Sequence, residues 1–329
     1  MSKHIQASVD QSYAFVFVCQ QHALEGMALL LAASLKRFLK CTYELIAAIP
    51  LPEKTWGKPS VKTLKILQKM GVRVEYIENP IIIQKKGDQL TNKIYCLQIP
   101  TQMDKLVFLD SDLLCLQEFG HEPRFRNQFN AAPTFRATGR NWEKVYQIFG
   151  LSSPQNTMKT LFSNELQPPY FNSGFVAVNA DLAQDLYQEW LNCFHQIDRS
   201  NVMQDNPYFR EQVSLSVAVI KMGLSYDVLD QNYNYWVKYE PLKESSLPYF
   251  LHHTWPYPPT YDQPFLKHLI RSLVDEYPGI YEFVARCRWK YYLRSDWLVS
   301  INRSAFDNRK VLQRWLGESW THALIQGHF

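Results

Sequence analysis

The sequence predicts an α/β protein with a mostly parallel central sheet, and two observations support this prediction. Up to residue 110, short apolar runs rich in β-branched and aromatic residues alternate with segments whose apolar residues recur at helical spacing. Strands and helices that alternate in this way are typical of parallel sheets. The chain is also long enough to bury such a sheet, since 46% of its 329 residues are hydrophobic.

The expected elements follow in chain order. Strands are predicted at residues 13–18, 42–49, 72–77 and 105–110, with the turn at Pro50 and Pro52 ending the second. Helices are predicted at 24–39, 60–70 and 91–99, with Gly71 closing the second. A loop-rich stretch (117–169) follows, and then a strand at 170–179 and a helix at 181–195. Another helix is predicted from Pro207 to Lys221, with Gly223 ending it. The chain continues with a short strand at 249–253, a proline-rich loop (256–264) and a helical remainder. We expect one domain at 1–262 and a helical C-terminal extension at 263–329 packed on it.

Composition and charge exclude several classes of protein. The 35 basic and 31 acidic side chains leave a net charge of +4, too small to indicate a nucleic-acid partner. Six widely spaced cysteines with no CxxC pair indicate buried thiols in a reducing compartment. The first residues lack the features of a signal peptide, and no apolar run approaches the roughly 18 residues needed to cross a bilayer. We therefore expect a cytoplasmic protein.

An acidic pair, Asp110 and Asp112, directly follows the fourth predicted strand. Ligands of open α/β sheets bind outside the carboxyl ends of the strands. Two carboxylates at this spacing can converge on a hard cation, which prefers oxygen ligands and often completes its shell with substrate phosphates. A solvated turn is the alternative, because Asp and Ser are common in turns. The apolar segments on both sides of the pair favour the metal site.

Five segments carry a resemblance to a known family in the same order along the chain. They are VFVCQQHALEGMALLLAASLKRF (16–38), TNKIYCLQIPTQMDKLVFLDSDLLCL (91–116), FNSGFVAVN (171–179), Glu211-Gln212 and YFLHHTWP (249–256). Together they resemble the family 8 glycosyltransferases, which include glycogenin and bacterial sugar transferases. The resemblance implies a GT-A fold, a DxD motif that holds Mn²⁺ or Mg²⁺, a UDP-sugar donor, and transfer with retention of anomeric configuration.

The resemblance also implies the metal ligands. Asp110 and Asp112 would hold the ion, with Asp110 also near the ribose. The third ligand would be a late histidine, either His252 or its neighbour His253. Strand alternation puts these two on opposite faces, and the register of the family pattern favours His252.

Further site residues are implied by their positions in the matched segments. Lys93 would approach the donor phosphate or sugar, where a cation offsets the charge of the diphosphate. The donor-sugar contacts would come from Asn172, Ser173 and Gly174, since Asn both donates and accepts hydrogen bonds and Gly allows a close backbone approach.

Glu211 and Gln212 would also lie beside the donor sugar. Gln212 would be on the face where a nucleophile sits in a retaining reaction, and we expect it to position the sugar rather than form a covalent intermediate. Glu211 can equally serve only to stabilise a helix N-terminus.

Three positions depart from the family pattern. Ala23 replaces an aromatic residue near the nucleobase, Glu211 replaces the usual Asp, and WPYPP at residues 255–259 replaces a lysine-containing KPW segment. The last change means that one phosphate contact is absent or supplied elsewhere.

The C-terminal extension allows two interpretations. Between residues 280 and 314 it combines eight basic residues with several aromatic ones, a composition that suits peripheral contact with the anionic inner face of the membrane and a lipid-linked acceptor. Alternatively, the aromatic residues pack on the main domain and the arginines form its solvated face. Acidic residues that interrupt the basic run favour this second interpretation: Glu282, Asp296 and Asp307.

The function that we predict is metal-dependent transfer of a hexose from a UDP-sugar to a hydroxyl of a glycan, a lipid-linked glycan or a protein. The alternative is a non-catalytic protein that binds a nucleotide sugar or glycan on the same scaffold. A nucleotidyltransferase is disfavoured, because it needs a glycine-rich loop after the first strand. The segment there, VCQQHALEG, has a single glycine.

Overall fold

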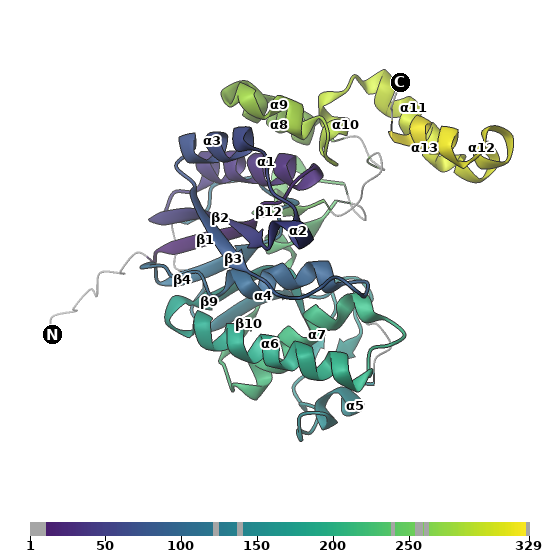
Figure 1. The fold of residues 1–329 in the computed structure, drawn as a ribbon. Helices are drawn as coiled ribbons and strands as arrows, with labels where there is room; N and C mark the ends of the chain where they lie inside the picture. The colour runs from purple at the N-terminus through teal and green to yellow at the C-terminus, as the bar shows by residue number, and fades with distance from the viewer. Residues whose placement is uncertain are drawn as a thin grey trace.

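Seven strands form the central sheet of the computed structural model, which describes residues 11–120, 125–136, 141–237, 241–253, 259 and 263–326 (Figure 1). Their order across the sheet is β10 (Tyr226–Val228), β6 (Phe129–Pro133), β9 (Phe171–Asn179), β4 (Lys105–Leu109), β1 (Tyr13–Val18), β2 (Tyr43–Leu51) and β3 (Arg73–Glu78). Strands β1 to β4 are parallel, and β9 runs antiparallel to both β4 and β6. The predicted fold class, α/β with a mostly parallel sheet and a helical C-terminal region, is confirmed.

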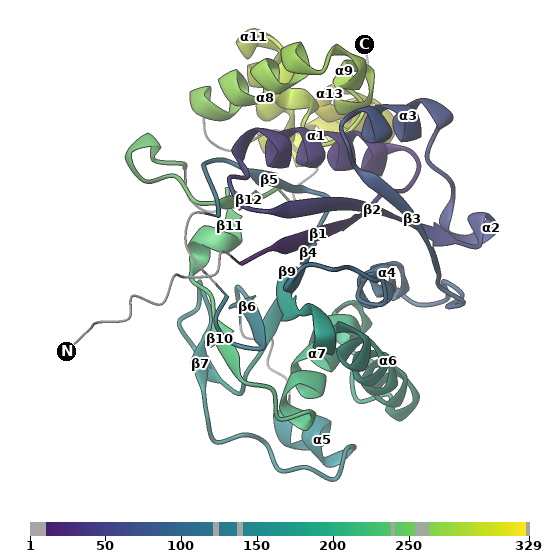
Figure 2. The same ribbon diagram turned by 90° about the vertical axis from the view of Figure 1, so that its left-hand side faces the viewer.

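Helices cover both faces of this sheet, as Figure 2 shows. On one face lie α1 (Ala23–Phe38), α3 (Val61–Lys69), α8 (Pro264–Glu276) and α9 (Tyr281–Val284); on the other lie α4 (Asn92–Cys96), α6 (Ala183–Ser200) and α7 (Arg210–Lys221). Every residue of β1 is buried, and its side chains alternate between two hydrophobic clusters, one on each face. This is the burial expected of a parallel strand covered on both sides.

A second, three-stranded sheet continues from the end of β4. It pairs β11 (Tyr235–Trp236) with β12 (Phe250–His252), and β12 with β5 (Leu113–Cys115). The chain leaves β4 at Leu109, turns through Asp110, Ser111 and Asp112, and enters β5, where Leu113 pairs with His252. The pairing therefore places His252 beside the acidic turn.

The remaining elements are short or C-terminal. They are α2 (Glu53–Trp56), η1 (Asp88–Thr91), α5 (Trp142–Gln147), β7 (Met158–Lys159), β8 (Leu166–Gln167), η2 (Ala180–Leu182), η3 (Pro207–Phe209), η4 (Gln231–Tyr233), η5 (Glu244–Ser246), η6 (Pro278–Ile280), α10 (Lys290–Leu293), α11 (Asp296–Asp307), α12 (Arg309–Leu316) and α13 (Glu318–Gln326). Among the described residues, none of the helices has both the length and the apolar character needed to cross a bilayer.

The structure adds to the predicted local structure at two places. The second strand does not end before Pro50 but continues to Leu51. The N–H that proline lacks would point toward β1, but β1 pairs with β2 only as far as Val18, opposite Ala48. The proline therefore removes no hydrogen bond from the sheet. The stretch 117–169 is not simply a loop, since it contributes β6 to the central sheet. That strand has the sequence FNAAP, which carries little β propensity.

Parts of the sequence analysis lie outside the described residues. They include the boundary at 262, which falls between described segments, and most of the WPYPP segment.

Candidate functional site

A cavity of about 580 Å³ opens at the carboxyl ends of β1 and β4. Strand β2 lies on one side of β1 and β4 on the other, so the chain order reverses at this point, where open α/β sheets bind their ligands. Eight of the residues predicted from the sequence line the cavity: Lys93, Asp110, Asp112, Asn172, Ser173, Glu211, Gln212 and His252.

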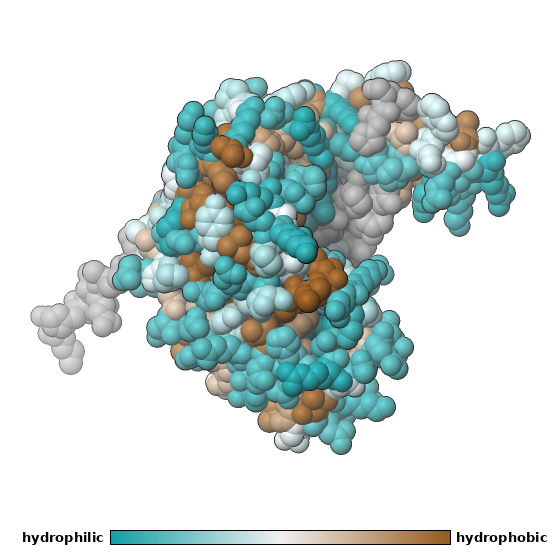
Figure 3. All heavy atoms as spheres, in the orientation of Figure 1, coloured by the Kyte–Doolittle hydropathy of each residue, from teal (hydrophilic) through white to brown (hydrophobic). Residues whose placement is uncertain are grey.

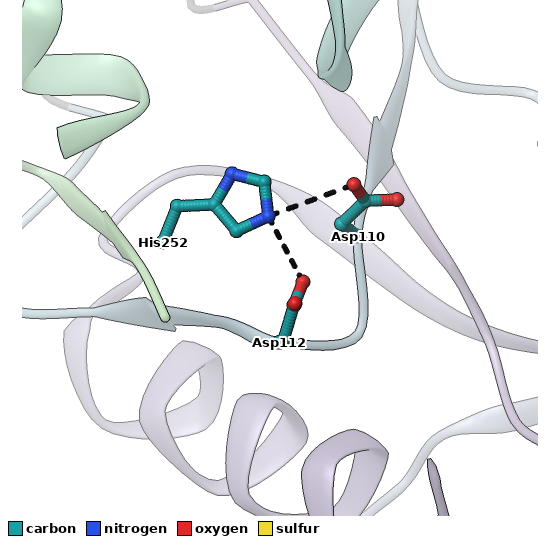
Figure 4. A group of neighbouring side chains, drawn as sticks. All are labelled: Asp110, Asp112 and His252. Carbon is teal, nitrogen blue, oxygen red and sulfur yellow. Dashed lines mark ion pairs between the residues drawn. The ribbon is translucent and has the colours of Figure 1, made fainter. Parts of the chain in front are cut away.

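Asp110, Asp112 and His252 converge on one point (Figure 4). Nε2 of His252 lies 3.0 Å from Oδ1 of Asp112 and 3.7 Å from Oδ2 of Asp110, and one ligand atom from each residue lies within 4.8 Å of the others. A divalent ion with bonds of about 2.1 Å separates neighbouring ligand atoms by about 3 Å. The three side chains therefore fit the coordination shell of one cation.

The orientation of the His252 ring suits a metal ligand. Asn234 donates from Nδ2 to Oδ1 of Asn172 at 2.8 Å, which leaves its own Oδ1 to accept a hydrogen bond from Nδ1 of His252 at 2.7 Å. Nε1 of Trp236, which can only donate, lies 3.2 Å from the same Nδ1 and competes with Asn234 for it. The shorter contact to Asn234 favours the tautomer with the proton on Nδ1, and in that tautomer the lone pair of Nε2 faces the two carboxylates, as a bound cation would require. Metal-binding histidines are commonly fixed by such a hydrogen bond from the other ring nitrogen.

His253 has a different environment. Its backbone N–H donates to the carbonyl of Asp112 at 3.1 Å, but its ring packs against Trp289, with the ring centroids 4.8 Å apart. Burial lowers its pKa to about 4, so the ring is neutral at neutral pH. The structure brings His252, and not His253, to the carboxylates.

Lys93 is a buried cation rather than an exposed helix lysine. Its Nζ donates to Asp110 at 2.9 Å and to Oγ of Ser173 at 3.3 Å. Burial disfavours the ammonium form, but Asp110 and Glu211 more than offset this effect and raise the pKa of Lys93 above its usual value. The side chain is therefore charged.

Asp112 has a cationic partner that the sequence analysis missed. Nη1 of Arg288 donates to Oδ2 of Asp112 at 2.6 Å and to the carbonyl of His253 at 2.9 Å. Burial opposes ionisation of Asp112, yet His252 and Arg288 hold its pKa below its usual range. Arg288 is one of eight basic residues in its segment, and nothing in the local pattern sets it apart from the others.

Gly174 lies where three site side chains meet. Its carbonyl accepts a hydrogen bond from the backbone N–H of Asp110 at 2.8 Å. A Cβ atom here would lie 2.9 Å from Oδ1 of Asn172, Oδ2 of Asp110 and Cε1 of His252. The glycine thus leaves room for the side chains of Asp110 and His252 to approach each other.

Glu211 and Gln212 lie in the first turn of α7 and are both buried. Oε2 of Glu211 accepts a hydrogen bond from Ser173 at 3.1 Å, while Oε1 is buried with no partner among the described residues. Burial raises the pKa of Glu211 to about 7, although Lys93 and Ser173 act in the opposite direction. Among the described residues, the side chain of Gln212 makes two long hydrogen bonds: its Oε1 accepts from Asn172 at 3.3 Å, and its Nε2 donates to Thr134 at 3.4 Å. Such long bonds are weak, so a ligand can replace them.

Comparison with known proteins identifies the family. No curated protein matches the sequence. The model of the Rhodobacterales glycosyltransferase domain family matches residues 15–223, which is more than half of the chain. The matched range includes most of β1, all of β4, β9 and α7, and all the predicted site residues except the late histidines. The chain belongs to the Rhodobacterales glycosyltransferase domain family.

Proposed function

We propose that this glycosyltransferase is metal-dependent and moves a hexose from a UDP-sugar to an acceptor hydroxyl with retention of configuration. The convergence of Asp110, Asp112 and His252 in the cavity is the observation that carries the proposal. The choice of UDP, the DxD role of the acidic pair and the retaining outcome rest on the resemblance to family 8 described above.

Mn²⁺ is the cation that we propose for the three ligands, with Mg²⁺ as the alternative. The carboxylates suit either ion, and the imidazole nitrogen favours Mn²⁺, because Mg²⁺ is bound almost entirely through oxygen. When bound, the ion would act as a Lewis acid on the diphosphate leaving group. Lys93, already charged beside Asp110, would add a fixed positive charge to the same region.

The donor sugar is proposed to lie against Asn172, Ser173 and Glu211. The buried Oε1 of Glu211 supports this placement, since a buried carboxylate oxygen without a donor is costly and a sugar hydroxyl would supply one. Gln212 would hold the sugar through its amide, because an amide is a poor nucleophile.

We propose a glycan, a lipid-linked glycan or a protein as acceptor, and peripheral membrane contact through the C-terminal helices. The aromatic residues of this region divide between the two interpretations. Trp289, Tyr291 and Tyr292 are buried, as packing on the main domain requires, whereas Trp297, Trp315 and Trp320 are 73%, 83% and 65% exposed. The three exposed residues belong to helices that lie apart from the central sheet in Figure 1 and form the protruding lobe of Figure 3. All six cysteines are free thiols, which supports action in the cytoplasm.

Sedimentation with vesicles tests the proposed membrane contact. We expect more protein to sediment with vesicles that contain anionic lipid than with neutral vesicles, and equal recovery with both would contradict the contact.

A donor screen tests the proposed activity directly. We expect release of UDP from a UDP-sugar in the presence of Mn²⁺, and no release when EDTA is present. The alternative function, a non-catalytic protein on the same scaffold, predicts that UDP-sugars bind without turnover with any acceptor.

A further inference from the structure

Both carboxylates of the metal-binding group already have a cationic partner. Lys93 lies 2.9 Å from Asp110, and Arg288 lies 2.6 Å from Asp112. A divalent ion bound to this group would therefore enter a site whose negative charge is already balanced, and would leave two positive charges without compensation. Glu211 can offset one of them at most. The charge of the site calls for an anionic ligand beside the metal.

Arg288 has donors available for such a ligand. Both of its hydrogen bonds, to Asp112 and to the carbonyl of His253, leave from Nη1. No contact in the described part of the chain uses its Nε or Nη2, and its side chain keeps 24% exposure where it lines the cavity. A guanidinium with unused donors on one edge suits the two-point recognition of a phosphate group.

The segment around Arg288 is firmly placed. Helix α9 approaches α1 so closely that a Cβ atom on Gly26 would lie 2.3 Å from the carbonyl oxygen of Phe283. Trp289 is fully buried against the ring of His253. The C-terminal extension thus holds the guanidinium at the cavity without needing a ligand to order it.

We propose that Arg288 binds the diphosphate of the nucleotide sugar, as a binding residue that the C-terminal extension supplies to the catalytic cavity. This inference rests on the proposed function. In the transfer, the acceptor hydroxyl oxygen forms a bond to the anomeric carbon as the bond from that carbon to the diphosphate breaks. The electron pair of the broken bond leaves with the diphosphate oxygen, which also takes up the hydroxyl proton, and Arg288 would stabilise the charge that develops there. Its pairing with Asp112 keeps the guanidinium in place before the donor binds.

Calorimetry with the full-length protein tests this role. The ligands are UDP and UMP, each with Mn²⁺, and Mn²⁺ alone; the variants are Arg288→Gln and Arg288→Lys, with the exposed Arg286→Gln as matched control from the same segment. We expect Arg288→Gln to weaken UDP binding by about 10–100-fold, as the loss of charge-assisted hydrogen bonds implies. UMP affinity should change less than about threefold, and Arg288→Lys should be intermediate.

Binding of Mn²⁺ alone separates this role from a structural one. If Arg288 serves the diphosphate, Arg288→Gln should bind Mn²⁺ at least as tightly as the wild type, because a cation competing for Asp112 has been removed. Equal losses for UDP, UMP and Mn²⁺, or UDP binding unchanged by Arg288→Gln, would overturn the inference.

The wild-type protein reports on the proposed function. If it bound GDP or ADP more tightly than UDP, the UDP donor would be rejected, while the role of Arg288 would still be judged by its variants. A wild type that binds no nucleoside diphosphate would overturn both.

Discussion

His252 and His253 are adjacent in sequence but differ in what each ring contacts. Because Nε2 of His252 faces both carboxylates whereas the ring of His253 packs against Trp289, we predict that His252→Ala weakens Mn²⁺ binding at least about tenfold. His253→Ala should lower thermal stability but leave the affinity for Mn²⁺ within about threefold. Calorimetric titration of both variants with Mn²⁺ checks this, and a larger loss of affinity in His253→Ala would reverse the assignment.

Gln212 is predicted to matter more to the transition state than to nucleotide binding. Its hydrogen bonds to Asn172 and Thr134 are long, so the amide can exchange them for contacts with a sugar. Within the described part of the chain, no hydrogen bond joins its side chain to the candidate metal ligands. Gln212→Ala should therefore lower kcat by about 10²–10³-fold. UDP affinity should stay within a few-fold of the wild type. Steady-state kinetics and calorimetry together decide this, and equal losses in both quantities would make Gln212 a donor-binding residue.

Glu211 gives the protein a pH-dependent stability. Its pKa of about 7 in the folded state lies above its usual 4.5, so the folded protein holds this proton more tightly than the unfolded chain does. The stabilisation is complete below about pH 4.5 and is lost as the pH rises toward about 7. Without metal, the free energy of unfolding of the wild type should fall relative to Glu211→Gln by roughly 1 kcal/mol per pH unit in this window. If the difference in the free energy of unfolding between the wild type and Glu211→Gln stayed constant with pH, the raised pKa of the buried carboxyl would be contradicted.

At the scale of elements, the contact between α1 and α9 holds the C-terminal extension beside the cavity. Gly26→Ala would force the carbonyl of Phe283 away, which should destabilise the protein by about 1–3 kcal/mol and weaken UDP binding by displacing Arg288. Gly279→Ala, in η6 just before α9, is the control, since its added methyl would meet only Ile66 of α3, at 3.4 Å. Denaturation and UDP titration of the two variants test the contact, and equal behaviour of the two would contradict it.

Sequence periodicity predicted the regular elements well, for a physical reason. Strands β1, β2 and β4 and helix α1 are strongly apolar and largely buried, so their patterns reflect burial directly. Strand β6 was missed because pairing with β9, which is far away in sequence, decides its conformation more than its own residues do. Arg288 was missed for the same reason: its partner Asp112 is 176 residues away, and no local pattern reports such a contact.

At the scale of the whole molecule, the cavity draws on regions spread along the chain. The acidic turn after β4, the start of β9, the first turn of α7, strand β12 and the segment after α9 each contribute to its lining. The sequence predicted the first four of these contributions through the family resemblance, and the structure brings their residues to one place. The fifth makes the C-terminal extension part of the site.

Metal-dependent turnover of a UDP-sugar is the central claim, and Asp112→Asn tests it most directly. The substitution keeps the size of a side chain that lies 3.0 Å from His252 and 2.6 Å from Arg288 but removes its charge. We predict that release of UDP in the presence of Mn²⁺ falls by at least about 100-fold, since several kcal/mol of transition-state stabilisation depend on the bound cation. The circular dichroism spectrum should match that of the wild type. Undiminished release by Asp112→Asn, or by the wild type in EDTA, would contradict the claim.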